Sequence, residues 1–443
     1  MKRSFFQYVS LNVLGALGLS GYILADTLFV AHRLGTDGLA ALNLAISVFG
    51  LINGLGLMLG IGGATRYAIC RTQGDGVRAD RAFSRALACG GTLGGLLALA
   101  GLLWAVPLAR LLGAEGAILP MCSVYLRTVL LFAPCFLLNH ILTAFVRNDG
   151  NPKLAMAAML LGSLSNIVLD YVFLKTLRMG VGGAAIATLI SQALSVVLCV
   201  LYIKEKTSFL IPGKEDFCWD KEMLKAQLSL GISMGLMNSI VSIGSVILQS
   251  AVNKLGSVII AGHTASRKVI EMFMQPLISI GVTATTYVSQ NLGAGKLDRI
   301  RKGLHCCTAI SFVWSTFCIL ISFWGIDLIL VLVVDAKEIQ VIATARQYFK
   351  INVFFFYALS VLFIYRNALQ GLGKSQAPIF SSCIEMVVKI LATLLLTPSL
   401  GYLGVCYTEP IAWILMAVFL LAAFYRDPRF RPGSHDESLD SSM

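Results

Sequence analysis

Apolar runs of about 20 residues, the length needed to cross a bilayer as a helix, follow one another along almost the whole chain. In lipid, backbone N–H and C=O groups must be hydrogen-bonded within the protein, which only helices and closed barrels achieve. The runs do not alternate apolar and polar residues as barrel strands do. Because 57% of the 443 residues are hydrophobic and 13% are charged, an ordinary soluble protein is excluded.

The runs predict an all-α polytopic membrane protein with twelve transmembrane helices. The first run follows Met1-Lys2-Arg3 but is too long for a signal peptide, carries Asp26 and lacks a small-x-small cleavage site, so we expect a retained first helix. The predicted spans are roughly 8–31, 38–62, 87–112, 119–146, 154–176, 181–203, 226–251, 257–289, 304–334, 344–369, 377–397 and 401–424.

The two halves of the chain resemble each other. Four short matches occur in the same order and at nearly one separation, about half the length of the chain, and they pair Leu34 with Leu255, Tyr67 with Tyr287, Gly150 with Gly373 and Gly182 with Gly404. Parallel repeats in so hydrophobic a chain are typical of transporters that hold substrate between two halves.

The repeat predicts two six-helix lobes related by a pseudo-two-fold axis near the membrane normal. The first lobe covers 1–203 and the second 226–425. A polar connector, 204–225, with five Lys and five acidic residues, joins them, and a polar tail, 426–443, is expected to be disordered. Pairs of glycines four residues apart, such as Gly56 and Gly60, predict close helix packing.

Charge in the loops predicts the orientation. With the spans above, the loops and ends on one side carry 23 Lys and Arg residues and those on the other side carry 8. By the positive-inside rule both termini are cytoplasmic, and the protein is a multi-pass protein of the cell membrane. The net charge of +12 therefore reflects orientation, and no basic stripe with aromatic residues points to nucleic acid.

Polar residues inside the spans are the candidates for function, because a carboxylate at membrane depth costs at least ~2.5–3.5 kcal/mol. In the first half these are Asp26, Asn166, Asp170 and Thr188. Met159, Ser163, Asn166 and Asp170 are spaced by 4, 3 and 4 residues and share one helix face. Two acids with amide and hydroxyl oxygens suit a hard monovalent cation or a shared proton, although each acid alone could be an interfacial or helix-end residue.

The second half has a different set of intramembrane charges, namely Arg267, Lys268, Glu271, Glu385, Lys389 and Glu409. Arg267/Glu271 and Glu385/Lys389 are opposite charges four residues apart, so each can be a self-neutralised structural pair or part of a charged cavity wall. We favour the structural interpretation for Glu385/Lys389 and the cavity for Glu271. In the repeat, Lys389 corresponds to Asn166, and the lobes therefore differ at this site.

Other chemistry finds no support in the sequence. The eleven Cys form no C-x-x-C and are treated as small apolar residues. Zinc-protease, nucleophile-elbow and P-loop motifs are missing, so we expect neither an enzyme nor ATP-driven transport.

The segments ADTLFVAHRLG, ASRKVIEMFMQPLISIGVTATTYVSQNLGAGK, NPKLAM, NIVLD, MGVGGAAIAT and EPIAW occur in the order found in the multidrug and toxic compound extrusion (MATE) family. Between about residues 20 and 425 the chain resembles that family. The resemblance implies two six-helix bundles and export of drug-like, cationic small molecules in exchange for Na⁺ or H⁺, by a membrane-embedded monomer without other cofactors.

The resemblance also implies residue roles. The cation site would comprise Asp26, Asn166, Asp170 and Thr188, and substrate would contact Tyr22, Met159 and Ser163. Some relatives carry acids in the seventh and tenth helices, and this chain has none there, so coupling through the first lobe is expected. A lipid-linked oligosaccharide flippase of the same superfamily is the alternative, supported by Arg267, Lys268 and Lys389 but opposed by Asp26 and Asp170.

Overall fold

The structure is a computed structural model that describes residues 48–116, 118–206, 247–331 and 338–430, with short pieces between 10 and 45 and between 232 and 245. The chain divides into two compact units, Met1–Gly235 and Leu236–Met443. Most of the predicted first span, with Tyr22 and Asp26, and most of the predicted connector, 204–225, lie outside the described residues. The division between lobes and connector therefore stays a prediction.

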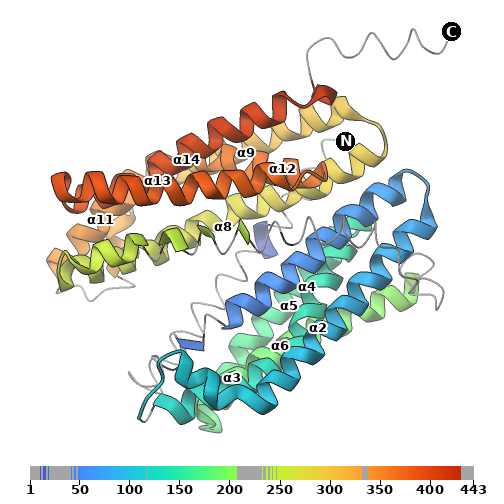
Figure 1. The fold of residues 1–443 in the computed structure, drawn as a ribbon, viewed down its shortest axis with the longest axis horizontal. Helices are drawn as coiled ribbons and strands as arrows, with labels where there is room; N and C mark the ends of the chain where they lie inside the picture. Colours follow the sequence, from blue (N-terminus) through green and yellow to red (C-terminus); the bar gives the residue numbers. More distant parts are fainter. Residues whose placement is uncertain are drawn as a thin grey trace. The chain divides into compact units, whose positions relative to one another are not determined.

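The described residues are helical and contain ten membrane-spanning segments, if each of two bent helix pairs is taken as one span. Figure 1 shows the helices by label. The first unit contains the helix Val48–Thr72, α2 (Gly76–Leu111), α3 (Ile118–Leu131), α4 (Ala133–Asn148), α5 (Pro152–Asp170), η1 (Tyr171–Thr176) and α6 (Gly180–Lys206). The second contains α8 (Ser257–Gly293), α9 (Leu297–Trp324), α10 (Ile326–Val331), α11 (Ile339–Phe354), α12 (Phe356–Gly371), α13 (Gln376–Leu400), α14 (Tyr402–Tyr425) and η3 (Pro428–Phe430).

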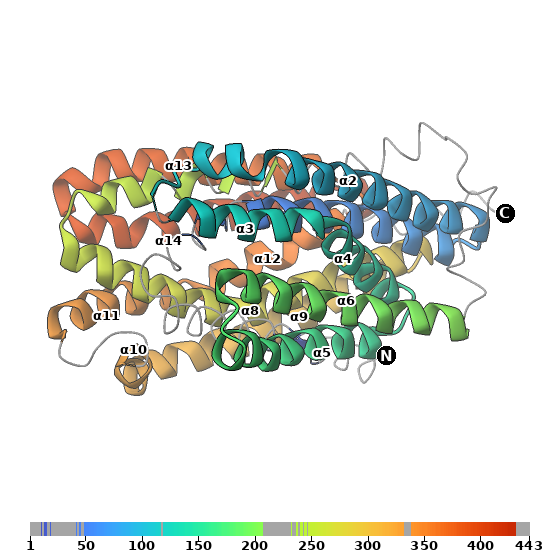
Figure 2. The same ribbon diagram turned by 90° about the horizontal axis from the view of Figure 1, so that it is seen from below.

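The spans match ten of the twelve predicted helices and confirm an all-α polytopic fold, but several boundaries were wrong. The predicted loop 63–86 is almost entirely helical, because the flanking helices continue to Thr72 and restart at Gly76. A helix satisfies its own backbone beyond the apolar core, and its Arg side chains can extend to water. The predicted span 304–334 ends at Trp324, and the separate short helix α10 packs against α9 and α11 (Figure 2).

The internal repeat is visible in the backbone. Two of the spans are bent helix pairs, α3 with α4 and α11 with α12. The first bends by 49° at Phe132 and the second by 56° at Phe355, which are equivalent positions in the repeat. Pro134 lies in the first turn after the first break, whereas the second has no proline and is tightened by an i→i+3 hydrogen bond from Phe355 N–H to Asn352 O. Glycines with positive φ follow helix ends at equivalent positions, Gly74 and Gly295, and Gly150 and Gly373.

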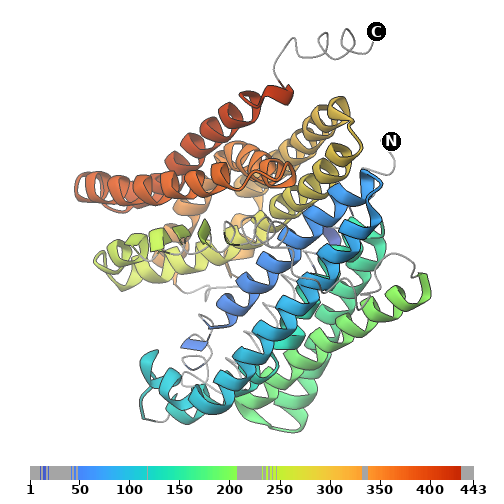
Figure 3. The same ribbon diagram turned by 45° about the vertical axis from the view of Figure 1, so that its right-hand side comes forward.

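Small residues let the helices of the first unit approach closely. An added Cβ at Gly94 of α2 would lie 2.6 Å from the Pro134 Cα, and at Gly60 it would lie 2.8 Å from the His140 carbonyl oxygen. Gly60 therefore has the packing role that was expected. An added Cβ at Gly91 or Gly95 of α2, in contrast, would meet no atom within 4 Å. Figure 3 shows how closely the long helices of this unit run alongside one another.

Residues 426 to 430, which we placed in the disordered tail, are instead ordered against the second unit. The Asp427 carboxylate is buried and accepts from Lys374 Nζ at 2.9 Å and from Arg429 Nη2 at 2.8 Å. Phe430 stacks on Phe424 with ring centroids 4.5 Å apart, and its carbonyl accepts from Arg301. This C-terminal clasp connects α14 to the start of α9 and to the turn between α12 and α13.

The clasp predicts a pH-dependent contribution to stability. Hydrogen bonds from Arg429 and Lys374 hold the pKa of Asp427 well below its usual range, although burial of the carboxylate opposes them. A depressed folded-state pKa stabilises above the unfolded value of about 3.9 and stops doing so as the pH falls through the folded pKa. Asp427→Asn should therefore lower the free energy of unfolding by about 1–3 kcal/mol at neutral pH.

Thermal unfolding of the purified protein measures this effect. The difference between wild type and Asp427→Asn should stay constant down to about pH 5 and shrink only in stronger acid. Asp298→Asn, in the first turn of α9, is the surface control. Equal unfolding midpoints of wild type and Asp427→Asn at pH 7 would show that the clasp does not stabilise the second unit.

Candidate functional site

Three of the predicted cation-site residues lie together in the interior of the first unit. Asn166 and Asp170, one turn apart on α5, and Thr188 of α6 are 1%, 0% and 5% exposed. With its amide nitrogen facing the carboxylate, Asn166 donates to Asp170 Oδ2 at 2.9 Å and accepts from Thr188 N–H at 3.2 Å. This orientation pairs donors with acceptors at both ends of the amide. Thr188 Oγ1 donates to the Ala184 carbonyl at 3.0 Å.

The helix geometry changes directly after Asp170. Residues Tyr171–Thr176 form the π-helix η1, and Leu177 N–H donates to the Val172 carbonyl five residues earlier at 2.9 Å. A π-helical turn inserts one residue relative to an α-helix and is common at functional sites. The change in helix type therefore lies next to the buried Asp170 carboxylate.

The predicted substrate residues of α5 continue along the same helix. Ser163 is 5% exposed and donates to the Met159 carbonyl at 2.8 Å, while Met159 Sδ contacts Arg147 Nη2 at 3.7 Å. The shared face that their spacing predicted is therefore present. Tyr22 and Asp26 lie outside the described residues, so their contribution to this site stays a prediction.

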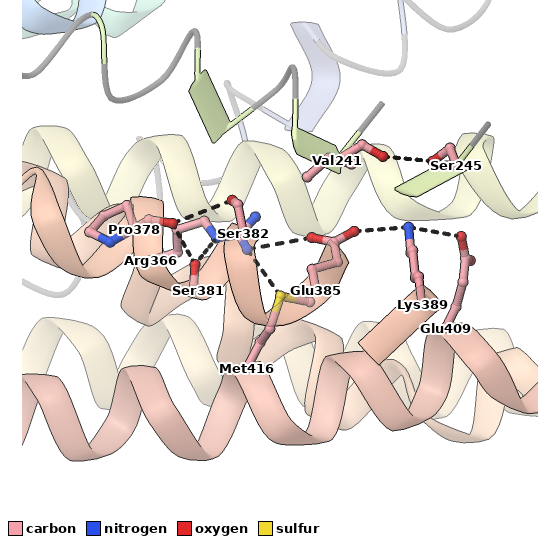
Figure 4. A network of polar contacts seen from close by, with 10 residues as sticks. All are labelled: Val241, Ser245, Arg366, Pro378, Ser381, Ser382, Glu385, Lys389, Glu409 and Met416. Atoms are coloured by element: carbon pink, nitrogen blue, oxygen red, sulfur yellow. Dashed lines mark hydrogen bonds and ion pairs between the residues drawn. The ribbon is translucent and has the colours of Figure 1, made fainter. Parts of the chain in front are cut away.

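The second unit contains a chain of buried charges (Figure 4). Lys389 Nζ lies 2.9 Å from Glu385 Oε1 and 3.5 Å from Glu409 Oε1. Glu385 Oε2 lies 3.7 Å from Arg366 Nη2, and Glu409 Oε2 accepts from the Tyr348 hydroxyl at 3.1 Å. The four charged side chains are between 3% and 11% exposed, and their formal charges cancel. Lys389 connects the Arg366–Glu385 pair to Glu409, so that one network spans α12, α13 and α14.

The second predicted pair, Arg267/Glu271, has a different environment. Arg267 Nη2 lies 3.4 Å from Glu271 Oε1 on α8, and the side chains are 27% and 61% exposed. Glu271 is therefore not a core residue of its own unit. Lys268, its neighbour on α8, is also exposed.

Sequence reasoning missed Arg366 and Tyr348 as members of the network. Arg366 is 5% exposed and donates to Ser381 Oγ at 3.1 Å as well as approaching Glu385. Arg366 lies near the end of the predicted span 344–369, and a charge at the end of an apolar run gives no local sign of a buried partner. Tyr348 is fully buried beside His263, with ring centroids 4.6 Å apart. Within the described residues, no group of three His, Cys, Asp or Glu side chains could hold a metal ion.

Close packing of α5 on α6 holds the Asn166–Asp170–Thr188 site together. An added Cβ at Gly162 would lie 2.5 Å from Ser195 Oγ, and Ser195 in turn donates to the Ala158 carbonyl at 2.7 Å. Gly162→Val should force the helices apart and lower the free energy of unfolding by about 1–3 kcal/mol. Thermal unfolding beside Gly95→Val, where α2 has open space, tests this, and equal midpoints for the two variants would contradict it.

Comparison with known proteins agrees with the internal repeat and identifies similar proteins. The MatE family model matches residues 13–172 and again 234–395, so it applies once to each half of the chain. Multidrug export protein MepA of Staphylococcus saprophyticus is 23% identical over 414 residues, which cover 93% of this chain and 91% of that protein. The probable multidrug resistance protein YoeA of Bacillus subtilis is 24% identical, and the match covers 75% of this chain and 72% of YoeA.

Solved structures share the fold. An outward-facing multidrug resistance MATE family transporter of the MOP superfamily superposes with a TM-score of 0.90 at 23% identity, with 97% of both chains covered. A MOP superfamily transporter from Pyrococcus furiosus, described as having a binding pocket of reverse polarity, superposes with a TM-score of 0.89 at 22% identity and the same coverage. Since the family model matches both halves and more than half of the residues, this multi-pass membrane protein belongs to the MatE family.

Proposed function

We propose that this protein exports amphipathic, cationic small molecules by alternating access in exchange for Na⁺ or H⁺. The observation that carries the proposal is the buried Asn166–Asp170–Thr188 site in the first lobe. A carboxylate in a membrane interior is costly and marks an ion path or proton relay. MepA is named a multidrug export protein and YoeA a probable multidrug resistance protein, and this chain is similar to both along most of its length.

The proposed coupling unit consists of Asp170 and Asp26. Entry of Na⁺ or H⁺ neutralises the pair, so the first-lobe helices no longer need to hold carboxylate charge away from lipid. The ion shifts the conformational equilibrium only by its differential affinity for the two states, and the same shift releases substrate outward. Asn166, which donates to Asp170 Oδ2, and Thr188 of α6 complete the proposed cation site, and the π-helix η1 begins directly after Asp170.

The second lobe supports an exporter of cations more than a flippase for anionic headgroups. Of the three cations that favour a flippase, Lys389 is neutralised by Glu385 and Glu409, Arg267 is paired with Glu271, and Lys268 is exposed. A basic surface for phosphate would need cations that are not already neutralised by carboxylates. We propose that Glu271, the most exposed of these acids, contacts cationic substrate, because a charge exposed on a membrane helix must reach a water-filled path.

Asp170→Asn tests the coupling role. We expect gradient-driven efflux to fall to the level of protein-free liposomes in this variant and in Asp26→Asn, because a neutral amide cannot exchange a proton or balance Na⁺. The measurement is efflux of a fluorescent cation from loaded proteoliposomes, with Na⁺ and pH gradients imposed separately. Glu115→Gln, an exposed acid between α2 and α3, is the control. Near-normal efflux in either aspartate variant would contradict coupling through the first lobe.

Glu271→Gln tests the substrate role. The variant should lose at most about 1 kcal/mol of stability, because Glu271 is 61% exposed and its contact with Arg267 is long, at 3.4 Å. Resistance to cationic compounds should fall several-fold, while resistance to neutral compounds stays unchanged. Glu338→Gln, at the exposed start of α11, is the matched control in the same drug panel. Unchanged resistance to every compound in a stable Glu271→Gln protein would remove this residue from the substrate path.

A further inference from the structure

A lysine in the second lobe occupies the position that an amide occupies in the first. Lys389 corresponds to Asn166 in the repeat, and the helices that carry them, α13 and α5, begin at nearly equivalent positions. Each helix packs against the next one in the chain, α14 or α6. Lys389 contacts Glu409 on α14, and Asn166 contacts Thr188 on α6, although Glu409 corresponds in the repeat to the neighbouring residue Ala187. The two lobes therefore place different chemistry between the same pair of helices.

The Lys389 ammonium lies between two carboxylates, as a bound metal cation would. Its Nζ is 2.9 Å from Glu385 and 3.5 Å from Glu409, and its side chain is 3% exposed. The outer oxygens of both acids are occupied, by Arg366 and by the Tyr348 hydroxyl. Every carboxylate oxygen of the pair therefore has a partner within the second lobe.

The backbone around Lys389 is shaped for a long side chain. An added Cβ at Gly244 would lie 3.0 Å from Lys389 Cδ and 3.7 Å from Met386 Cα. The lysine stem therefore packs tightly against the backbone at Gly244. Shortening the lysine to alanine removes this packed stem together with the ammonium that lies between Glu385 and Glu409.

We propose that the Lys389 ammonium is a permanently bound cation that fills a second monovalent-cation site, formed by Glu385 and Glu409. Carboxylate oxygens are hard ligands that suit Na⁺ or H⁺. A covalently tethered ammonium does not dissociate, so this site cannot take part in ion exchange. The consequence for transport, that only the first lobe exchanges its ion, rests on the proposed function.

Removal of the ammonium should convert the second lobe into an exchangeable site. In Lys389→Ala the buried charges change from balanced to one excess negative charge, and a free cation then stabilises the fold by mass action. The experiment uses full-length protein carrying Asp170→Asn, so that an ion response of the first lobe is absent. Thermal unfolding is followed against NaCl, with choline chloride holding the ionic strength constant, and against pH.

We expect Na⁺ or a lower pH to raise the unfolding midpoint of Lys389→Ala by about 5 °C. The midpoint of the parent protein, which carries Asp170→Asn alone, should not change. Adding Glu409→Gln should abolish the response, and Lys389→Arg, which keeps the charge, should show none. The Na⁺ and pH arms distinguish the two ions. The groups facing the site that can also titrate or act on its charge are Glu385, Glu409, Arg366, Tyr348, His263, Arg267, Glu271 and Tyr402.

Two results would overturn the inference. One is a folded Lys389→Ala protein that responds to neither ion more than its parent does. The other is a Lys389→Ala protein that fails to fold at every Na⁺ concentration and pH, while the charge-balanced double variant Lys389→Met/Glu409→Gln does fold. Failure of the proposed function would look different, because wild type and Asp170→Asn would then respond equally to Na⁺ and pH, whatever Lys389→Ala does.

Discussion

The cost of an unpaired polar group in hydrocarbon is the constraint on which the rest of this structure depends. It makes the described backbone helical, and it requires each charged side chain inside a span to find a partner or a water-filled path. In the second lobe, Lys389 meets this requirement through two carboxylates, and Arg366 and Tyr348 complete the set. In the first lobe, Asp170 is buried beside an amide and a hydroxyl instead.

The family model matches each half of the chain once, and the described helices of the two halves share several features. Helix breaks at Phe132 and Phe355 and the glycines that end helices are equivalent in the two halves. Side chains diverged where they meet inside each bundle, because the backbone tolerates exchange of an amide for an ammonium when the neighbouring residues balance the charge. The two lobes therefore differ in charge, with a charge-balanced network in the second and a buried carboxylate in the first.

The second-lobe network illustrates how stability and function are separated in such a protein. A buried ion pair is weak evidence for stability, since desolvation opposes the attraction, but breaking it leaves a costly lone charge. The structural interpretation of Glu385/Lys389 is therefore consistent with their contacts, and it extends to Glu409, which the sequence left as an isolated acid. Glu271, by contrast, is 61% exposed on α8 and pairs only with the partly exposed Arg267 among the ion pairs of the described residues.

The sequence by itself determined the features that depend on one helix. Apolar length indicated ten spans that the structure describes, and spacings of three and four residues placed Asn166 with Asp170 and Glu385 with Lys389, because the helical period is fixed by the backbone. Only the tertiary structure decided which helices face each other. In it Lys389 contacts Glu409 and Arg366 contacts Glu385, the span formed by α11 and α12 bends without a proline, and Asp427 is buried beyond the last span. These contacts join residues far apart in the sequence, and they depend on the shape and charge of neighbours that no local pattern contains.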